Sequence, residues 1–231
     1  MTVAAVIVAA GRGVRMGAGR PKAFVRVGGT TVLERSVRAF ASHPRVGRIV
    51  VAVSDPPSAA RALGPLAARV VLVRGGAERQ ESVRAALGAI PENEADIVLV
   101  HDAARPLVER ELVDAVIEAA GKAGAAVPAT VPASTVKRVA EDGRVQGTLP
   151  RDRLRLAQTP QGFLAPILRR AHAAAVRDGY VGTDDAALVE RTGRSVRVVE
   201  GSEENIKITT PVDLLLAEAI LGRRGRGGRR G

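Results

Sequence analysis

The sequence predicts a single α/β domain in which helices cover both faces of a mostly parallel, twisted β-sheet. Short apolar runs alternate with amphipathic stretches of helical period, which is typical of repeated βαβ units. Apolar residues make up 46% of the 231 residues but aromatic residues only 2%, so the core must consist of Val, Leu, Ile and Ala, as in a buried parallel sheet. The length suits one domain with a small excursion.

The predicted elements alternate in a regular order. We expect strands at residues 3–9, 49–53, 70–73, 97–100, 125–129 and 196–199. Helices are expected between these strands at residues 32–41, 58–67, 78–90 and 109–120. The third of these helices carries Val83, Leu87 and Ile90 on one face, which should pack on the sheet.

The pattern changes after Pro128. Residues 131–158 are polar and contain several arginines, with no long helical pattern and no core strand, so we expect a protruding β-arm there. Helical periodicity returns at residues 164–177, 184–191 and 211–221, with Thr183 and Thr210 as the expected caps of the last two helices. We expect one domain at residues 1–221 and a disordered Arg/Gly tail at residues 222–231.

Composition excludes several classes of protein. Without cysteine there can be no disulfide and no thiolate metal site, and only three histidines are present to bind a metal. No apolar run is long enough to cross a membrane and the first residues lack the charged region of a signal peptide, so we expect a cytoplasmic protein. One Tyr and no Trp offer almost no platform on which single-stranded nucleic acid could stack.

The net charge of +11 indicates anionic partners. Residues 222–231 contribute five arginines and no acid, and the rest of the chain is basic as well. Phosphates are the expected partners of the domain. Nucleic acid binding through the tail is a less favoured alternative, because Gly- and Arg-rich ends rarely become ordered without a partner.

A glycine-rich loop follows the first predicted strand. Its sequence is Gly11-Arg12-Gly13-Val14-Arg15-Met16, and Pro21-Lys22 comes shortly after it. Glycines allow backbone N–H groups to approach phosphate oxygens. A Walker A loop is excluded because no Gly-Lys-Ser/Thr follows, and a dinucleotide fingerprint is disfavoured because Met16 stands where its third glycine belongs. The basic residues instead favour a nucleoside triphosphate whose pyrophosphate leaves.

Two later strand ends carry further candidate residues. Between the third predicted strand and its helix, backbone groups near Gly76 and the Ser82 hydroxyl could bind the edge of a base. At the end of the fourth strand, Asp102 faces the same edge of the sheet, and a carboxylate beside a triphosphate suits Mg²⁺. Arg105 offers a planar fork to a second phosphate. We regard His101 as structural, and we assign no role to the two other histidines, His43 and His172.

Together these segments resemble the 2-C-methyl-D-erythritol 4-phosphate cytidylyltransferases, a family of non-mevalonate isoprenoid synthesis (the MEP pathway). The resemblance spans roughly residues 3–221 and rests on segments 9–16, 21–22, 75–83, 101–106, 135–137, 159–161, 183–184 and 205–207. It implies a Rossmann-like nucleotidyltransferase fold that transfers a cytidylyl group from CTP to methylerythritol phosphate and releases pyrophosphate. It also implies Mg²⁺ and a homodimer whose β-arms are exchanged between subunits.

The resemblance also implies roles for individual residues. Catalytic roles would fall to Arg15, Lys22 and Lys207. CTP would be bound by Ala9, Ala10, Gly11, Gly13, Arg15, Lys22, Gly76, Ser82 and Ala103. Methylerythritol phosphate would be bound by Asp102, Arg105, Thr135, Arg151, Thr159 and Lys207, with Asp102 also near the metal and both Arg151 and Thr159 provided by the partner subunit. In the arm, Arg151 is preferred over Arg153. Ala77 stands where some relatives carry a carboxylate, so here only its backbone could recognise the base.

The types of residue present suit this chemistry. A phosphate monoester is already largely ionised at neutral pH and needs no general base, so cations and loop N–H groups suffice to position the two polyanions and stabilise the added charge. Other classes remain possible: a ribitol-phosphate or other sugar-phosphate nucleotidyltransferase, a nucleic-acid-binding protein, or a dinucleotide-dependent oxidoreductase. The last lacks the carboxylate expected for the ribose.

Overall fold

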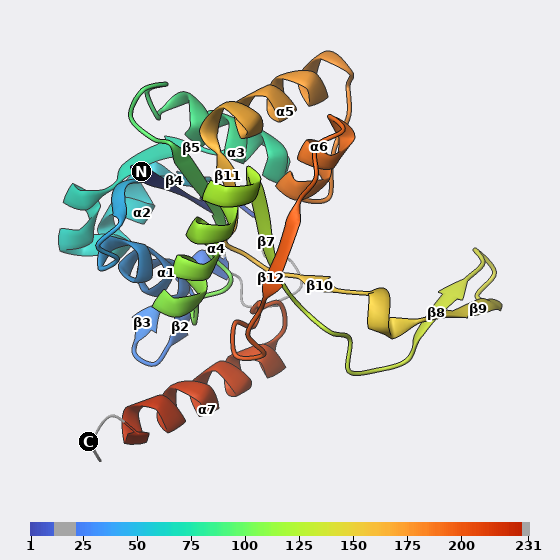
Figure 1. Cartoon of the computed structure of the whole chain (residues 1–231). Helices are drawn as coiled ribbons and strands as arrows, with labels where there is room; N and C mark the ends of the chain where they lie inside the picture. Colours follow the sequence, from blue (N-terminus) through green and yellow to red (C-terminus); the bar gives the residue numbers. More distant parts are fainter. Residues whose placement is uncertain (12–21, 228–231) are drawn as a thin grey trace.

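A central β-sheet with helices on both faces forms the body of the molecule (Figure 1). The computed structural model describes residues 1–11 and 22–227. The strands of the sheet lie in the order β10-β7-β11-β6-β1-β4-β5, and β12 also pairs with β7. Their bounds are β1 (Val3–Ala9), β4 (Val46–Val53), β5 (Val71–Arg74), β6 (Ile97–Asp102), β7 (Ala125–Thr130), β10 (Leu156–Ala157), β11 (Gln161–Leu164) and β12 (Arg197–Glu200). The predicted α/β class is confirmed.

Helices cover this sheet in two layers. One layer contains α1 (Val32–Ala41), α2 (Pro56–Leu63) and α4 (Arg110–Ala123), and the other contains α3 (Arg79–Gly88), α5 (Ala165–Arg177) and α6 (Asp185–Arg191). The strands β1, β4, β5 and β6 are mutually parallel, as the alternation of strands and helices predicts.

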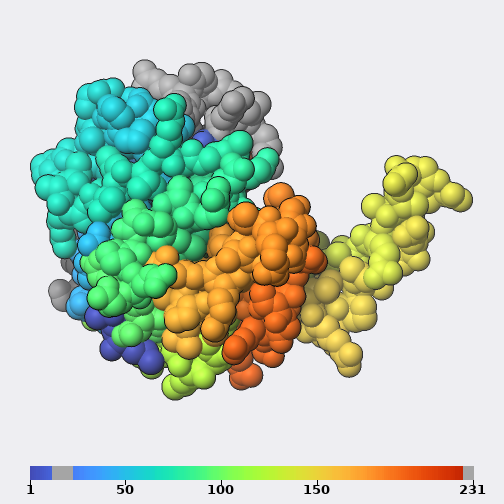
Figure 2. Space-filling view, turned by 90° about the horizontal axis from the view of Figure 1, so that it is seen from above, coloured from blue at the N-terminus to red at the C-terminus, as the bar shows by residue number. Residues whose placement is uncertain are grey.

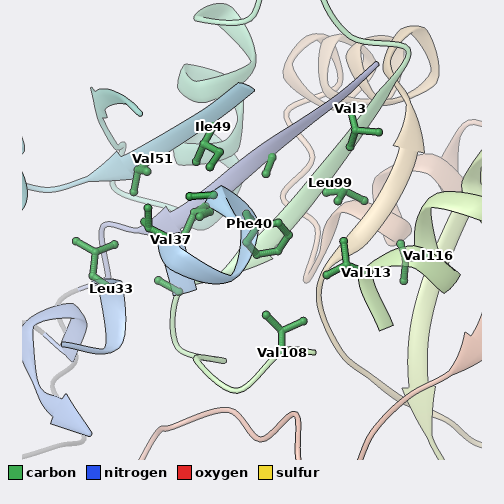
Figure 3. Close-up of a cluster of buried hydrophobic side chains, with 14 of the residues drawn as sticks. Val3, Leu33, Val37, Phe40, Ile49, Val51, Leu99, Val108, Val113 and Val116 are labelled. Carbon is green, nitrogen blue, oxygen red and sulfur yellow. The ribbon is translucent and has the colours of Figure 1, made fainter. Parts of the chain in front are cut away.

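Both faces of the central strands are buried, because a layer of helices covers each face. The side chains of a strand alternate between the two faces. Ala5 and Ile7 of β1 belong to the core under α1 and α4, where Phe40 is fully buried. Figure 3 shows Phe40 in this core together with Leu99, Val113 and Val116. Ala4 and Val6 face the opposite core, under α3 and α5. Continuous apolar runs are therefore required in these strands.

Strand β11 was not expected. We predicted no core strand before the helix at 164–177, but Gln161–Leu164 forms an antiparallel strand between β6 and β7. A side chain at Gly162 would place its Cβ 2.7 Å from Val116 Cγ1 of α4, so the glycine allows the strand and the helix to approach closely. A glycine in a short segment conceals the strand pattern, and the sheet remains mostly parallel.

Two predicted helix ends also differ. The helix predicted at 58–67 ends at Leu63, because Gly64 adopts a φ of 54° and Pro65 follows; a short 3-10 helix, η3 (Gly64–Arg69), continues the chain. The cap of α6 is Asp184 and not Thr183, since the Asp184 carboxylate accepts a hydrogen bond from the Ala187 N–H at 2.9 Å.

The last helix, α7 (Pro211–Gly227), begins at Pro211 as predicted but continues into the segment that we expected to be disordered. Arg224 explains part of this order, because its guanidinium contacts Glu204 at 2.8 Å and Glu109 at 2.9 Å. Ala217 and Ile220 pack in a third apolar cluster with Val27 and Ile208. Residues 222–227 therefore belong to α7 in this structure, whereas we expected a disordered tail from residue 222, and residues 228–231 lie outside the described range.

The predicted arm is present as a hairpin of β8 (Val136–Val139) and β9 (Val145–Leu149), which pair only with each other among the described strands. Figures 1 and 2 show it extending away from the body. A short 3-10 helix, η4 (Arg151–Arg153), leads the chain back to the sheet at β10. The remaining short elements are η2 (Lys22–Phe24), β2 (Arg26–Val27) and β3 (Thr30–Thr31).

Candidate active site

The predicted nucleotide-binding segments meet at the carboxyl edge of the parallel strands. Val8 of β1 is in register with Asp102 of β6, and the Ala103 N–H donates to the Val8 carbonyl at 3.0 Å. A Cβ at Gly75 would lie 2.5 Å from the Cβ of Ala10, so the loop after β5 lies directly against the end of β1. Ligands of open α/β sheets bind at this edge.

Part of the glycine-rich loop lies outside the described residues. Ala9 ends β1 and is followed by Ala10 and Gly11, which is exposed. Gly13 and Arg15 fall in the undescribed range 12–21. Lys22 begins η2, but its side chain is also outside the description. The roles expected for Gly13, Arg15 and Lys22 therefore stay predictions.

The loop between β5 and α3 is held by its own side chains. The Ser82 hydroxyl accepts from the Gly76 N–H at 3.1 Å and donates to the Glu78 carbonyl at 3.2 Å. The Glu81 carboxylate accepts from the Ala77 N–H at 2.8 Å. Ser82 is only 1% exposed. Its hydroxyl thus fixes the loop from within, and the backbone is the part of this loop that can face a base.

Asp102 lies between two cations. Its Oδ1 accepts from Arg79 Nε at 3.0 Å and its Oδ2 from Lys207 Nζ at 2.5 Å. Burial would raise the pKa of Asp102, but the charges and hydrogen bonds of Arg79 and Lys207 outweigh it and hold that pKa well below its usual range. The carboxylate is therefore ionised, while the Lys207 side chain stays 44% exposed toward the edge of the sheet.

Sequence reasoning missed two charged residues of this cluster, Arg79 and Asp185. Arg79 Nη1 donates to Asp185 Oδ2 at 2.6 Å, and His172 Nε2 donates to Asp185 Oδ1 at 2.9 Å. Asp185 is 1% exposed, and although burial opposes it, the Arg79 charge lowers the pKa of Asp185 below its ordinary value. Arg79 begins the helix after a strand-end loop. This position in the sequence is the signal that could have identified it as a candidate site residue. The pairing with Asp185, 106 residues away, leaves no trace in the local pattern.

Thr159 and His101 fix the end of β6. The Thr159 hydroxyl accepts from the Asp102 N–H at 3.0 Å and bonds to His101 Nδ1 at 3.1 Å. His101 Nε2 donates to the Arg105 carbonyl at 3.1 Å. Burial lowers the pKa of His101 to about 4, so the ring is neutral at pH 7 and its Nδ1 accepts from Thr159. His101 is structural, as expected.

Thr159 also corrects an expectation. We placed it with the arm and expected it to reach the partner's site, but it lies 5% exposed beside Asp102 of its own chain. The cause is β11, which brings the end of the arm segment back against β6. The two remaining histidines are buried as well, with Asp114 near His43 at 3.4 Å and Asp185 bonded to His172.

Arg105 holds the segment that carries Lys207. Its Nη1 donates to the Asn205 carbonyl at 2.6 Å and its Nη2 to the Ala157 carbonyl at 3.3 Å. The Ile208 N–H also donates to the Ala104 carbonyl at 2.8 Å. Both terminal nitrogens of Arg105 are thus engaged by the protein, while its buried Nε has no hydrogen-bond partner among the described residues.

Thr135 and Arg151 lie in the arm segment, and both are exposed. Arg151 Nη1 donates to the Ala133 carbonyl at 2.9 Å, which joins the segments before β8 and after β9 at the base of the arm. Within the described part of the chain, neither side chain has a hydrogen bond to Asp102 or Lys207. The single subunit therefore brings together Ala103, Asp102, Arg105, Thr159 and Lys207 but not the two arm residues.

The described residues do not fit a protein-held metal site. Outside residues 12–21 and 228–231 there is no cluster of three or more His, Cys, Asp or Glu side chains that could hold a metal. Asp102, the expected ligand, already gives one oxygen to each of two cations, and their positive charge disfavours a divalent ion beside it. Asp102 as a Mg²⁺ ligand is therefore a prediction that this geometry does not support. Among the described helices, none is long and apolar enough to span a membrane.

Comparison with known proteins identifies relatives over almost the whole chain. Residues 3–223 match the family described as IspD: 2-C-methyl-D-erythritol 4-phosphate cytidylyltransferase. The chain is 48% identical to a protein of that name from Saccharopolyspora erythraea, over 96% of this chain and 100% of that one. A crystal structure of the protein so named from Thermus thermophilus is similar, with a TM-score of 0.79, 44% identity and coverage of 95% of this chain and 98% of that one.

Some relatives are longer. The bifunctional enzyme IspD/IspF of Nitrobacter winogradskyi is 47% identical over 94% of this chain, which spans only 55% of the length of that enzyme.

Proposed function

The chain belongs to the 2-C-methyl-D-erythritol 4-phosphate cytidylyltransferase family and so transfers a cytidylyl group from CTP to methylerythritol phosphate, and we propose that the carboxyl edge of its sheet carries out this reaction. The observation that carries the proposal is the position of Lys207. Its ammonium, bonded to Asp102, stands at the strand edge where the loops after β1 and β5 also lie.

The reaction is an in-line displacement at phosphorus. An oxygen of the acceptor phosphate forms a bond to the α-phosphorus of CTP, and the bond from that phosphorus to the bridging oxygen of the β-phosphate breaks. Pyrophosphate leaves with the electron pair. The acceptor oxygen is already ionised, so the protein needs to position two polyanions and stabilise the charge that develops on the leaving group.

We assign the acceptor to the cluster around Asp102. Lys207 contributes a half-exposed ammonium that can donate to a phosphate oxygen. Asp102, ionised and compensated by two cations, can accept hydrogen bonds from the hydroxyl groups of the polyol. Arg105 and Thr159 hold the backbone on either side of this pair and complete the acceptor site.

We assign CTP to the two glycine-containing loops. The backbone of residues 75–78, fixed by Ser82 and Glu81, would recognise cytosine, and Ala103 would lie near the ribose. Ala9 to Gly13, with Arg15 and Lys22, would hold the triphosphate. A divalent cation is consistent with the family. We propose that it is Mg²⁺, bound by the triphosphate oxygens that it prefers.

We further propose a homodimer formed through the arm. Val139 and Val145 of the hairpin are 55% and 61% exposed, and Val131 and Leu156 at its base are 53% and 54% exposed. A second copy would cover these apolar side chains and would bring Thr135 and Arg151 to the site of its neighbour. Beside the arm, a cavity of about 810 Å³ lined by Val131, Arg153, Val198 and Glu203, among others, offers room for the partner.

Pyrophosphate release tests the substrate assignment. With methylerythritol phosphate and Mg²⁺, CTP should be used at least about tenfold better than ATP, GTP or UTP in kcat/KM. Ribitol 5-phosphate in place of the acceptor is the control for the alternative that the comparisons do not favour. Equal use of the four nucleotides, or a preference for ribitol phosphate, would contradict the assignment.

Chelation of divalent cations should abolish turnover, and Mg²⁺ should restore it. Because CTP is a cytoplasmic metabolite, we place the enzyme in the cytoplasm, which cell fractionation can check.

A further inference from the structure

We propose that Arg79, Asp185 and His172 are positioning residues that act through Asp102 to hold Lys207 in place for the acceptor phosphate. This inference rests on the proposed role of Lys207. The chain of contacts is continuous: Lys207 to Asp102 at 2.5 Å, Asp102 to Arg79 at 3.0 Å, Arg79 to Asp185 at 2.6 Å, and Asp185 to His172 at 2.9 Å.

Arg79 can set the orientation of Asp102 because its guanidinium is rigid and planar. Its Nε bonds Asp102 and its Nη1 bonds Asp185, so the two carboxylates are held at a fixed spacing. Asp185 is 1% exposed and is held in turn by His172, which is 3% exposed on α5. The end of this chain of contacts at Asp185 and His172 is therefore anchored in the core. Only the other end, Lys207, reaches the site.

The chain of contacts also has an electrostatic effect on Lys207. With Arg79 in place, Asp102 shares its negative charge between two cations, so Lys207 keeps part of its positive field for the substrate. Without Arg79, Asp102 would neutralise Lys207 alone. Loss of this chain of contacts should therefore lower kcat/KM for the acceptor more than it weakens the binding of CTP.

Asp185 is the best residue for testing this proposal. Arg79 begins α3, directly after the loop assigned to cytosine, so its replacement could disturb CTP as well. Asp185 lies on α6, and its two side-chain hydrogen bonds go to Arg79 and His172. The competing explanation is that this chain of contacts only stabilises the packing of α6 on α3. In that case its loss would lower stability without any special connection to Lys207.

A double-mutant cycle distinguishes the two explanations. Asp185→Asn should lower kcat/KM for methylerythritol phosphate by about 10²-fold, the scale of a small misplacement at a reacting centre. The KM for CTP should stay within about twofold. In the Lys207→Ala background the same change should cost less than about threefold, because residues that act in series are not additive. Glu190→Gln, exposed on the same helix, is the matched control and should leave the kinetics unchanged.

His172→Gln and His172→Ala provide a second route if Asp185→Asn does not fold, as judged by circular dichroism and CTP binding. Glutamine keeps a donor for Asp185, so it should retain more kcat/KM than alanine does. Equal losses from Asp185→Asn in both backgrounds, or normal kinetics of folded Asp185→Asn, would overturn the positioning role. Normal turnover of Lys207→Ala alone would instead overturn the acceptor-site assignment on which the inference rests.

Discussion

At the scale of single residues, the proposed site depends on two lysines and one carboxylate. Lys207 is bonded to Asp102 at the edge of the sheet, and Arg105 and the Ile208 N–H fix the backbone that carries it. Lys22 follows the glycine-rich loop in sequence. A compact ammonium can approach one phosphoryl oxygen where a guanidinium would not fit, which agrees with the roles that we propose for both lysines.

Replacement of either lysine should reduce turnover. We expect Lys22→Ala and Lys207→Ala each to lower kcat by ~10²–10³-fold, the effect of losing one preorganised donor to developing charge. Pyrophosphate release at saturating CTP and acceptor measures this effect. Lys122→Ala, which removes an exposed lysine from α4, is the control. Normal turnover in either active-site variant would remove that residue from the mechanism.

His101 should make stability depend on pH. Burial lowers its pKa from 6.5 to about 4 in the folded protein. Between these values the unfolded chain binds a proton that the folded chain does not, so the free energy of unfolding falls as the pH drops from 6.5 to 4. The loss from this residue is at most about 3 kcal/mol.

Urea unfolding at several pH values between 6.5 and 4.5 tests the His101 prediction. The slope of unfolding free energy against pH should be smaller for His101→Gln than for the unchanged protein. His43, whose pKa burial also lowers, contributes to the slope in both proteins, so the difference between them isolates His101. Identical slopes would show that His101 is not held neutral by the fold.

At the scale of elements, β11 determines the geometry of the site. It inserts antiparallel between β6 and β7 and so places Thr159 beside Asp102 of the same chain. Its side chains also anchor α6, because the Gln161 side chain accepts from the Ala186 N–H at 3.1 Å and donates to the Asp184 carboxylate at 2.7 Å. The strand therefore connects the acceptor site to the helix that carries Asp185.

Gly162 should be required for β11 to fit. We expect Gly162→Ala to lower the free energy of unfolding by about 1–3 kcal/mol, because the new methyl group would overlap Val116 and crowd Ala120 of α4. Urea denaturation measures the change. Gly147→Ala in the arm strand β9 adds the same methyl group where no atom lies within 4 Å, and should change stability far less. Equal effects of the two substitutions would contradict this account of β11.

At the scale of the whole molecule, the arm is the part on which the proposed homodimer depends. Its hairpin projects from the body (Figure 2). Val139 and Val145 of the hairpin are exposed, and Thr135 and Arg151 make no hydrogen bond to Asp102 or Lys207 in the described structure. A homodimer would bury the valines and complete two sites. Each site would then contain residues from both chains.

Mixing two inactive variants tests this shared site. Arg151→Ala and Lys207→Ala should each be nearly inactive alone. If Arg151 serves the partner's site, a mixed dimer contains one site with both changes and one unchanged site, so random exchange should restore about a quarter of full activity. Pyrophosphate release after co-refolding, with the dimer confirmed by analytical ultracentrifugation, measures the recovery. Absence of recovery in a verified mixed dimer would place Arg151 outside the partner's site.

The sequence by itself determined the α/β class, the order of most strands and helices, and the presence of the arm. These follow from local causes: the period of apolar residues, the glycines at strand ends and the composition of each segment. It also predicted Asp102 at the sheet edge, since the ends of parallel strands share one edge. Lys207 was expected beside it only from the family resemblance.

Only the tertiary structure decided which charges pair and which distant segments lie side by side. Arg79, Asp185 and His172 meet across separations that no local period records, and the Thr159 hydroxyl bonds to Asp102 of its own chain. The helix that continues to Gly227 has the same cause, because Arg224 finds Glu109 and Glu204 only once the chain has folded. Such contacts depend on packing between distant segments, whereas a sequence pattern reports only what neighbouring residues favour.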